Sequence, residues 1–163
     1  MIVVSDTSPL NYLVLIGAID ALPQLFGRVC VPEVVLAELR DPATPAAVRA
    51  WTQSPPGWIL AQAPSNPGDP ALAKLHPGER HAIALARELH ADHLLIDERR
   101  GRRVAVDLGV PVIGLLGVLD LAAAAKLINL RETIMALAQT SFRVDPALVD
   151  MLLERDARRM AGP

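Results

Sequence analysis

The sequence predicts a three-layer α/β/α domain, in which helices cover both faces of a mostly parallel central sheet of four or five strands. The first observation behind this prediction is an alternation of short apolar segments with longer segments of helical periodicity. The second is that the short segments are continuously apolar, which is typical of strands buried on both faces. The third is size, because 163 residues with 52% hydrophobic content suffice for one domain with a substantial core.

Each element follows from local signals. Gly17 and Gly27 are expected to end the first two helices, and Pro23 is expected to kink the second. Ser8 is predicted to cap the first helix, and Asp145 the last. Strands are predicted at residues 2–5, 28–31, 58–61, 93–96 and 110–113. Helices are predicted at residues 10–16, 19–26, 32–40, 45–53, 79–90, 99–108, 115–127, 130–140 and 146–159.

The domain organisation is predicted to be one main domain, residues 1–140, followed by a helical extension, residues 141–163. The last helix is amphipathic, with Leu148 and Leu152 on one side and charged residues elsewhere. Its apolar face requires a partner. The extension therefore packs on its own domain or serves as an arm for a second copy or another protein.

Composition limits the classes of partner. A net charge of −2 gives no overall attraction to nucleic acid or anionic membranes, so any nucleic-acid contact requires a local basic patch. The most apolar stretch is interrupted by Pro111 and Asp120 and is too short to span a bilayer, and no signal peptide is visible, so no membrane association is expected.

The single cysteine, Cys30, excludes an internal disulfide. Its apolar neighbours predict a buried thiol, which fits a reducing cytosol.

Two carboxylates directly follow predicted buried strands. Asp6 ends the first strand and Asp97 ends the fourth. The carboxyl ends of parallel strands meet at one edge of the sheet, where ligands bind in α/β folds, so these side chains are expected to lie close together. Each of them alone also fits a helix-capping carboxylate.

Two more acids lie on the inward faces of predicted helices. Glu38 follows apolar Val34 by four residues, and Glu79 precedes apolar Ala82 and Ile83 by three and four. Glu79 also fits the first turn of its helix, where the dipole stabilises an acid. Clustered buried carboxylates are costly unless a cation compensates them, and Mg²⁺ or Mn²⁺ prefers such oxygen ligands. We therefore expect a metal centre of the kind that supports phosphodiester hydrolysis.

Four stretches that contain these acids, residues 4–10, 31–39, 78–86 and 94–103, resemble the PIN-domain nuclease family. The resemblance covers residues 2–128. Together, the four stretches are similar to a poorly characterised PIN-like subgroup related to VapC-type toxins. It implies an endoribonuclease that uses Mg²⁺ or Mn²⁺. By matching position, Asp6, Glu38, Glu79 and Asp97 would be the metal-binding and catalytic acids, and Ser8 would support the first of them.

The sequence departs from the family pattern at two acidic positions. The third acid is more often Asp but here is Glu79, and the fourth stretch ends in the pair Asp97-Glu98, which leaves open whether Asp97 or Glu98 faces the metal. A basic run follows this pair, and it either contacts RNA phosphates or forms a solvated helix face. Its members are Arg99, Arg100, Arg102 and Arg103.

The resemblance implies a cytoplasmic ribonuclease with an RNA substrate, acting as the toxin of a toxin–antitoxin pair. Its expected partners are an antitoxin protein and a second copy of the chain. The acidic character and the two departures support an alternative, a catalytically weak PIN-like protein that regulates by binding RNA or a partner. A third alternative is a metal-dependent phosphoesterase that acts on small molecules or DNA.

Overall fold

The computed structural model describes residues 1–162 and contains one five-stranded sheet, with the strand order β3-β2-β1-β4-β5. Every neighbouring pair of strands is parallel, which confirms the predicted α/β class. All five predicted strands form, each at or within its predicted segment. They are β1 (Val3–Ser5), β2 (Val29–Val31), β3 (Ile59–Ala61), β4 (His93–Leu95) and β5 (Val112–Ile113).

The register of the sheet aligns the ends of its two central strands. Val3 of β1 lies opposite His93 of β4, and Ser5 lies opposite Leu95. The backbone N–H of Asp6 then donates a hydrogen bond to the carbonyl of Leu95 at 2.9 Å. The residues that follow β1 and β4 therefore leave the sheet at the same edge.

All nine predicted helices form within residues 1–162, with ends shifted by up to three residues, and one short 3₁₀ turn is added. The helices are α1 (Thr7–Leu15), α2 (Ala21–Phe26), α3 (Glu33–Leu39), α4 (Ala46–Gln53), α5 (Pro77–Glu88), α6 (Arg99–Asp107), α7 (Leu115–Ala124), α8 (Leu130–Ala138) and α9 (Pro146–Ala161), and the turn is η1 (Pro70–Leu72).

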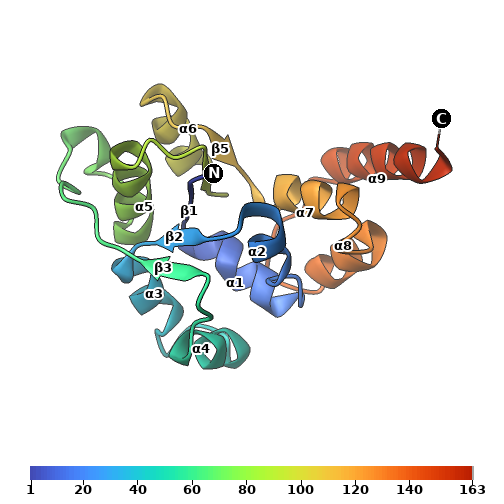
Figure 1. Ribbon diagram of the computed structural model, residues 1–163, viewed down its shortest axis with the longest axis horizontal. Helices are drawn as coiled ribbons and strands as arrows, with labels where there is room; N and C mark the ends of the chain where they lie inside the picture. The colour runs from blue at the N-terminus through green and yellow to red at the C-terminus, as the bar shows by residue number, and fades with distance from the viewer. Residues whose placement is uncertain (163) are drawn as a thin grey trace.

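The alternation of side chains along the strands divides the core in two. Val3 and Leu95 point into a larger cluster that contains apolar residues of α1, α2, α3 and α7. Val4 and Leu94 point into a second cluster formed with α5 and α6. Figure 1 shows these two groups of helices on opposite sides of the sheet. Both faces of the sheet are thus covered, as continuously apolar strands require.

Two predictions about helix starts are wrong. Helix α1 begins at Thr7, so the N-cap position belongs to Asp6 rather than Ser8, and no side chain caps this helix. Pro23 does not break α2, because it is the third helical residue. An N–H in the first turn has no partner within the helix, so proline loses nothing there.

Other local predictions are confirmed. Gly17 and Gly27 end helices with φ of +70° and +75°, values that favour glycine. The Asp145 side chain caps α9 by accepting a hydrogen bond from the N–H of Ala147 at 3.0 Å. Cys30 is free as expected, but it is only partly buried, and this burial raises the pKa of its thiol.

Helix α9 packs against α7 and α8 of its own chain, and Figure 1 shows these three helices grouped together at one end of the molecule. Leu152 is buried in this contact. Asp120 of α7 accepts hydrogen bonds from Arg155 and Arg159 of α9, each at 2.8 Å. Among residues 1–162, no helix is both long enough and apolar enough to cross a membrane.

Candidate active site

A cleft of about 710 Å³ opens where β1 and β4 end, and the acids predicted from the sequence line it. Its walls come from parts of the chain that lie far apart in the sequence. The acidic lining residues are Asp6, Glu38, Glu79, Asp97 and Glu98, and the others are Thr7, Ser8, Asn11, Tyr12, Leu39, Thr44, His76, Ser141, Phe142 and Arg143. The structure thus brings all four principal acids into one cavity.

Asp6 is the most deeply placed of these acids, with 4% of its surface exposed. Burial raises its pKa to about 7, against the opposing effect of the Thr7 N–H, and the nearby charges of Glu79, Glu38 and Asp97 raise it further. In the absence of a cation this carboxyl group therefore binds a proton much more readily than an ordinary aspartate does. A positive charge in the cleft would favour its ionised form.

Asp97 has one satisfied and one unsatisfied oxygen. Its Oδ1 accepts a hydrogen bond from the N–H of Leu115, at the start of α7, at 2.8 Å. Its Oδ2 is buried and has no hydrogen-bond partner within residues 1–162. Burial raises the pKa of Asp97, while the Leu115 N–H and the charge of Arg102 lower it. A buried carboxylate oxygen without a partner is costly, so this atom favours an additional cation or proton.

Glu98, the alternative to Asp97, has a structural task. It occupies the N-cap position of α6, and its Oε2 accepts a hydrogen bond from the N–H of Gly101 at 2.7 Å. Glu98 still lines the cleft and raises the pKa of Glu79 by its charge. Of the adjacent pair, Asp97 therefore offers the buried, unpartnered oxygen, and Glu98 caps a helix.

Glu38 uses both of its oxygens to join three helices. Thr7 Oγ1 of α1 donates to Glu38 Oε2, and the backbone N–H of Gly78 in α5 donates to Glu38 Oε1 at 2.9 Å. The fit against α5 is so close that a Cβ atom on Gly78 would lie 2.9 Å from Oε1. A side chain at position 78 would therefore require the Glu38 carboxylate to move.

Glu79 faces the interior, as its helical position predicts, with 8% of its surface exposed. Burial raises its pKa, and the charges of Glu98 and Glu38 add to this effect, while His76 lowers it. Glu79 comes close to α6, since a Cβ atom on Gly101 would lie 3.4 Å from its Oε2. A carboxyl group with a raised pKa in a cleft is suited to proton transfer.

Within residues 1–162, no three carboxylate, imidazole or thiol groups converge tightly enough to form a complete set of metal ligands. Mg²⁺ does not require one, because proteins usually bind it through one or two carboxylates and leave water on the other positions. The unpartnered Oδ2 of Asp97 and the buried carboxyl group of Asp6 supply hard oxygen atoms of this kind. The donor set therefore fits Mg²⁺ or Mn²⁺ with a largely hydrated coordination shell.

The predicted basic run divides into two pairs. Arg99 and Arg102 line a second cleft beside the acidic one, and Arg102 also donates a hydrogen bond to the carbonyl of Ile96 at 2.9 Å. Arg100 and Arg103 are exposed and line neither cleft. Only the first pair is thus placed beside the acids.

Several residues of the site carry no signal in the sequence. Thr7 directly follows Asp6, and nothing in the local pattern shows that its hydroxyl reaches Glu38. Gly78 resembles an ordinary helix-start glycine. The segment 141–143 comes from the loop between α8 and α9, and no local signal directs it to a site formed by the first strand.

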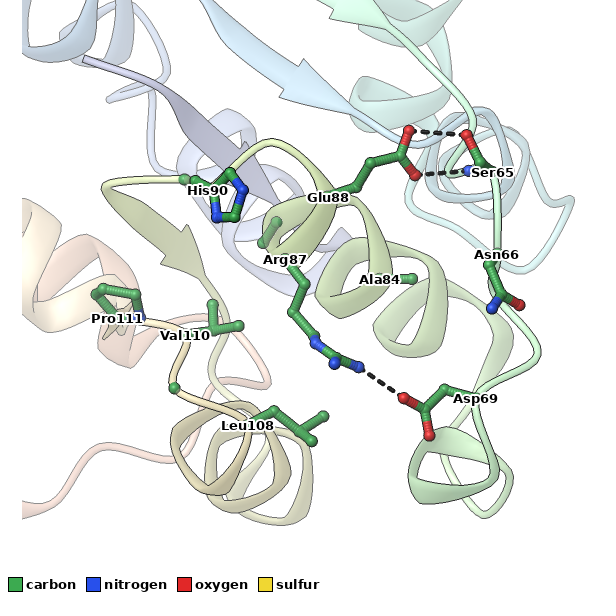
Figure 2. Close-up of a pocket in the computed structure, with 13 residues that line it drawn as sticks. Ser65, Asn66, Asp69, Ala84, Arg87, Glu88, His90, Leu108, Val110 and Pro111 are labelled. Atoms are coloured by element: carbon green, nitrogen blue, oxygen red, sulfur yellow. Dashed lines mark hydrogen bonds and ion pairs between the residues drawn. The ribbon is translucent and has the colours of Figure 1, made fainter.

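A further cavity of about 720 Å³ lies between α5, the loop before it and the segment after α6, and none of the predicted acids lines it (Figure 2). Its charged groups already have partners. Arg87 pairs with Asp69 at 2.6 Å, and Glu88 accepts hydrogen bonds from the N–H and the hydroxyl of Ser65 at 2.7 and 2.8 Å. These contacts fasten the loop to α5, so the cavity offers no comparable chemistry.

A comparison with models of protein families matched residues 2–158 to a model described as a PIN domain. Searches of curated proteins and of solved structures gave no match. PIN domains are generally nucleases, and they typically use divalent metals. The match extends over nearly the whole chain and agrees with the parallel sheet and with the carboxylates at its edge. The chain therefore belongs to the PIN domain family.

Proposed function

We propose that the protein is an endoribonuclease that depends on Mg²⁺ or Mn²⁺. The observation that carries this proposal is the meeting of Asp6, Glu79 and Asp97 in one cleft, with one buried Asp97 oxygen left without a partner. Three neighbouring carboxylates repel one another and are poorly hydrated, so they favour a bound cation. In a nuclease family, such a cation serves phosphodiester hydrolysis.

The residues of the cleft take different roles in this proposal. Asp6 and Asp97 hold the cation, and when bound it stabilises charge on the scissile phosphate and lowers the pKa of water. Glu79 has a raised pKa, and its carboxylate orients the attacking water and accepts its proton.

Glu38 and Glu98 act through their neighbours. Both oxygens of Glu38 are engaged by Thr7 and Gly78, so Glu38 positions α1 and α5 relative to each other. Its charge also contributes to the raised pKa of Asp6. Glu98 holds the start of α6 and adds negative charge beside Glu79. Ser8 lines the same cleft. Its proposed role, support of Asp6 by its hydroxyl, rests on the resemblance to the family motif.

The test is a titration of Mn²⁺ into the wild-type protein and the Asp6→Asn variant, with cleavage of a labelled single-stranded RNA followed in parallel. The matched control is Asp107→Asn, which removes an exposed carboxylate of α6 that does not line the cleft. We expect Asp6→Asn to lose both Mn²⁺ binding and cleavage, and the control to retain both. Equal cleavage by wild type and Asp6→Asn, unaffected by EDTA, would refute the proposal.

We further propose that this ribonuclease is a cytoplasmic toxin of VapC type, held inactive by an antitoxin protein and able to form a homodimer. The sequence motifs support this assignment. A small neighbouring gene for a DNA-binding protein, together with growth arrest on expression of the wild-type chain but not of Asp6→Asn, would establish it. Normal growth with active enzyme in the cell would contradict it.

A second candidate is a PIN-like protein that binds RNA or a partner and cleaves weakly. Two observations favour it: no complete set of metal ligands exists within residues 1–162, and both oxygens of Glu38 are already hydrogen-bonded. Calorimetry at millimolar Mg²⁺ separates the candidates. Binding of RNA without binding of Mg²⁺ or Mn²⁺ would favour the regulatory protein.

A further inference from the structure

A second cleft, of about 590 Å³, adjoins the acidic cleft. The two share three lining residues, Asp97, Phe142 and Arg143, so they adjoin at this point. The second cleft also contains Arg99 and Arg102 of α6 and the start of α7. We call it the arginine cleft.

The free charge of the arginine cleft is positive. Within residues 1–162, none of Arg99, Arg102 and Arg143 forms an ion pair with a carboxylate. The cleft also contains two acids, Asp97, whose pKa the charge of Arg102 lowers, and Asp145, which caps α9, so its three arginines outnumber its carboxylates. In a chain with 16 basic and 18 acidic residues, three unpaired guanidinium groups around one cavity form a local anion-binding surface.

Arg143 is exposed and lines both clefts, and the two loop residues before it are fastened to α1. Phe142 packs edge-on against the ring of Tyr12, with the ring centroids 5.1 Å apart. The hydroxyl groups of Tyr12 and Ser141 are hydrogen-bonded at 2.8 Å. Tyr12 lies on α1, the helix that starts directly after Asp6. The loop is thus fastened to the same helix that carries the first acid into the site.

We propose that the arginine cleft, with Arg143 as its central residue, binds the RNA phosphate adjacent to the scissile one. This inference rests on the proposed ribonuclease function. The phosphates of an RNA strand in the acidic cleft are repelled by the carboxylates there. Positive charge beside the next phosphate of the strand would offset this repulsion. The arginine cleft is the adjoining space, and guanidinium groups bind phosphate oxygens in a bidentate manner. The strand then runs from the acidic cleft past Phe142 to Arg143.

The test measures binding of a labelled single-stranded RNA to the Asp6→Asn protein, so that cleavage does not interfere. Arg143→Gln and Arg99→Gln are each added to this background. The control is Arg28→Gln. Arg28 is exposed, forms no ion pair within residues 1–162, and lies just before β2, at the edge of the sheet opposite to the acidic cleft. Arg102 is not replaced, because it donates a hydrogen bond to the backbone carbonyl of Ile96 and its loss could disturb the fold.

Arg143→Gln removes one charged contact and is therefore expected to weaken RNA binding about tenfold. RNA affinity decreases as the salt concentration rises. The plot of log affinity against log salt should become less steep by about 0.7 for each phosphate contact removed. Arg28→Gln should change neither quantity. Unchanged affinity in Arg143→Gln, or an equal loss in Arg28→Gln, would overturn the inference. RNA cleavage by the wild-type protein is measured separately. If RNA binding depends on Arg143 but the wild-type protein cleaves no RNA, the proposed ribonuclease function is refuted and the binding inference is not.

Discussion

The N–H of Leu115 donates a hydrogen bond to Oδ1 of Asp97 at 2.8 Å, while Oδ2 of the same carboxylate is buried without a partner. The start of α7 thereby fixes the orientation of a side chain delivered by β4. Groups that orient a metal-binding side chain in this way increase its effectiveness, because the ligand is already in position before the ion arrives. This hydrogen bond also distinguishes the role of Asp97 from that of its neighbour Glu98, whose side chain caps α6.

Replacement of Asp97 by Asn tests this role. Asn retains an oxygen that can accept the hydrogen bond from Leu115, so we expect the fold to be maintained. A cation contributes several kcal/mol to catalysis, so its loss should lower RNA cleavage by about 100-fold or more. Thermal unfolding with and without Mn²⁺ and cleavage rates provide the measurements. Unchanged activity and an unchanged Mn²⁺ effect would show that Asp97 does not bind the ion.

Replacement of Thr7 by Val tests the positioning role of Glu38. The variant keeps the shape of the side chain but leaves Glu38 Oε2 without its donor. We expect a loss of about 1 kcal/mol in the free energy of unfolding, the usual net contribution of one hydrogen bond, because this pair is only part-buried. Urea denaturation measures this loss. Thr7→Ser keeps the hydroxyl and should recover most of it, and equal losses in the two variants would contradict the assignment.

Replacement of Gly78 by Ala tests the close approach of α5 to Glu38. The new Cβ atom would lie 2.9 Å from Glu38 Oε1 and still closer to Oε2, so the carboxylate has to move. We expect destabilisation by about 1–3 kcal/mol together with lower RNA cleavage. Gly57→Ala is the control, because nothing lies within 4 Å of a Cβ atom there. A Gly78→Ala protein as stable and active as this control would show that Glu38 tolerates displacement.

The raised pKa of Asp6 predicts a pH dependence of stability in the absence of metal. The folded state binds the proton more tightly than the unfolded state, so this contribution is present in full below the ordinary pKa of 3.8 and is lost as the pH rises through about 7. Between pH 5 and pH 8 in EDTA, wild type should lose about 2–3 kcal/mol more than Asp6→Asn does. Urea denaturation at both pH values measures the difference, and parallel pH profiles would contradict it.

Most of the fold could be predicted from the sequence, because its signals are local. Continuous apolar segments identified all five strands, and glycines such as Gly17 and Gly27 marked helix ends. The errors came from local signals that the tertiary structure overrides. Ser8 has the chemistry of a cap, but the helix starts two residues earlier, directly after Asp6, whose backbone continues the pairing with β4.

The acids of the site could also be predicted, because strand ends and helix faces determine where side chains point. Asp6, Glu38, Glu79 and Asp97 all line one cleft. Contacts between distant segments could not be predicted. The bond from Thr7 to Glu38 and the placement of Arg143 beside Asp97 depend on how α1, α3 and the loop before α9 pack, and no short pattern encodes this packing.

Diffraction at the manganese absorption edge, from crystals grown with Mn²⁺, tests the central claim most directly. We expect an anomalous peak in the acidic cleft, at ligand distance from the carboxylates of Asp6 and Asp97, with most remaining positions filled by water. The same crystals of Asp6→Asn should lack this peak. A cleft without any peak at saturating Mn²⁺, or ions bound only elsewhere on the surface, would contradict a metal-dependent site in this protein.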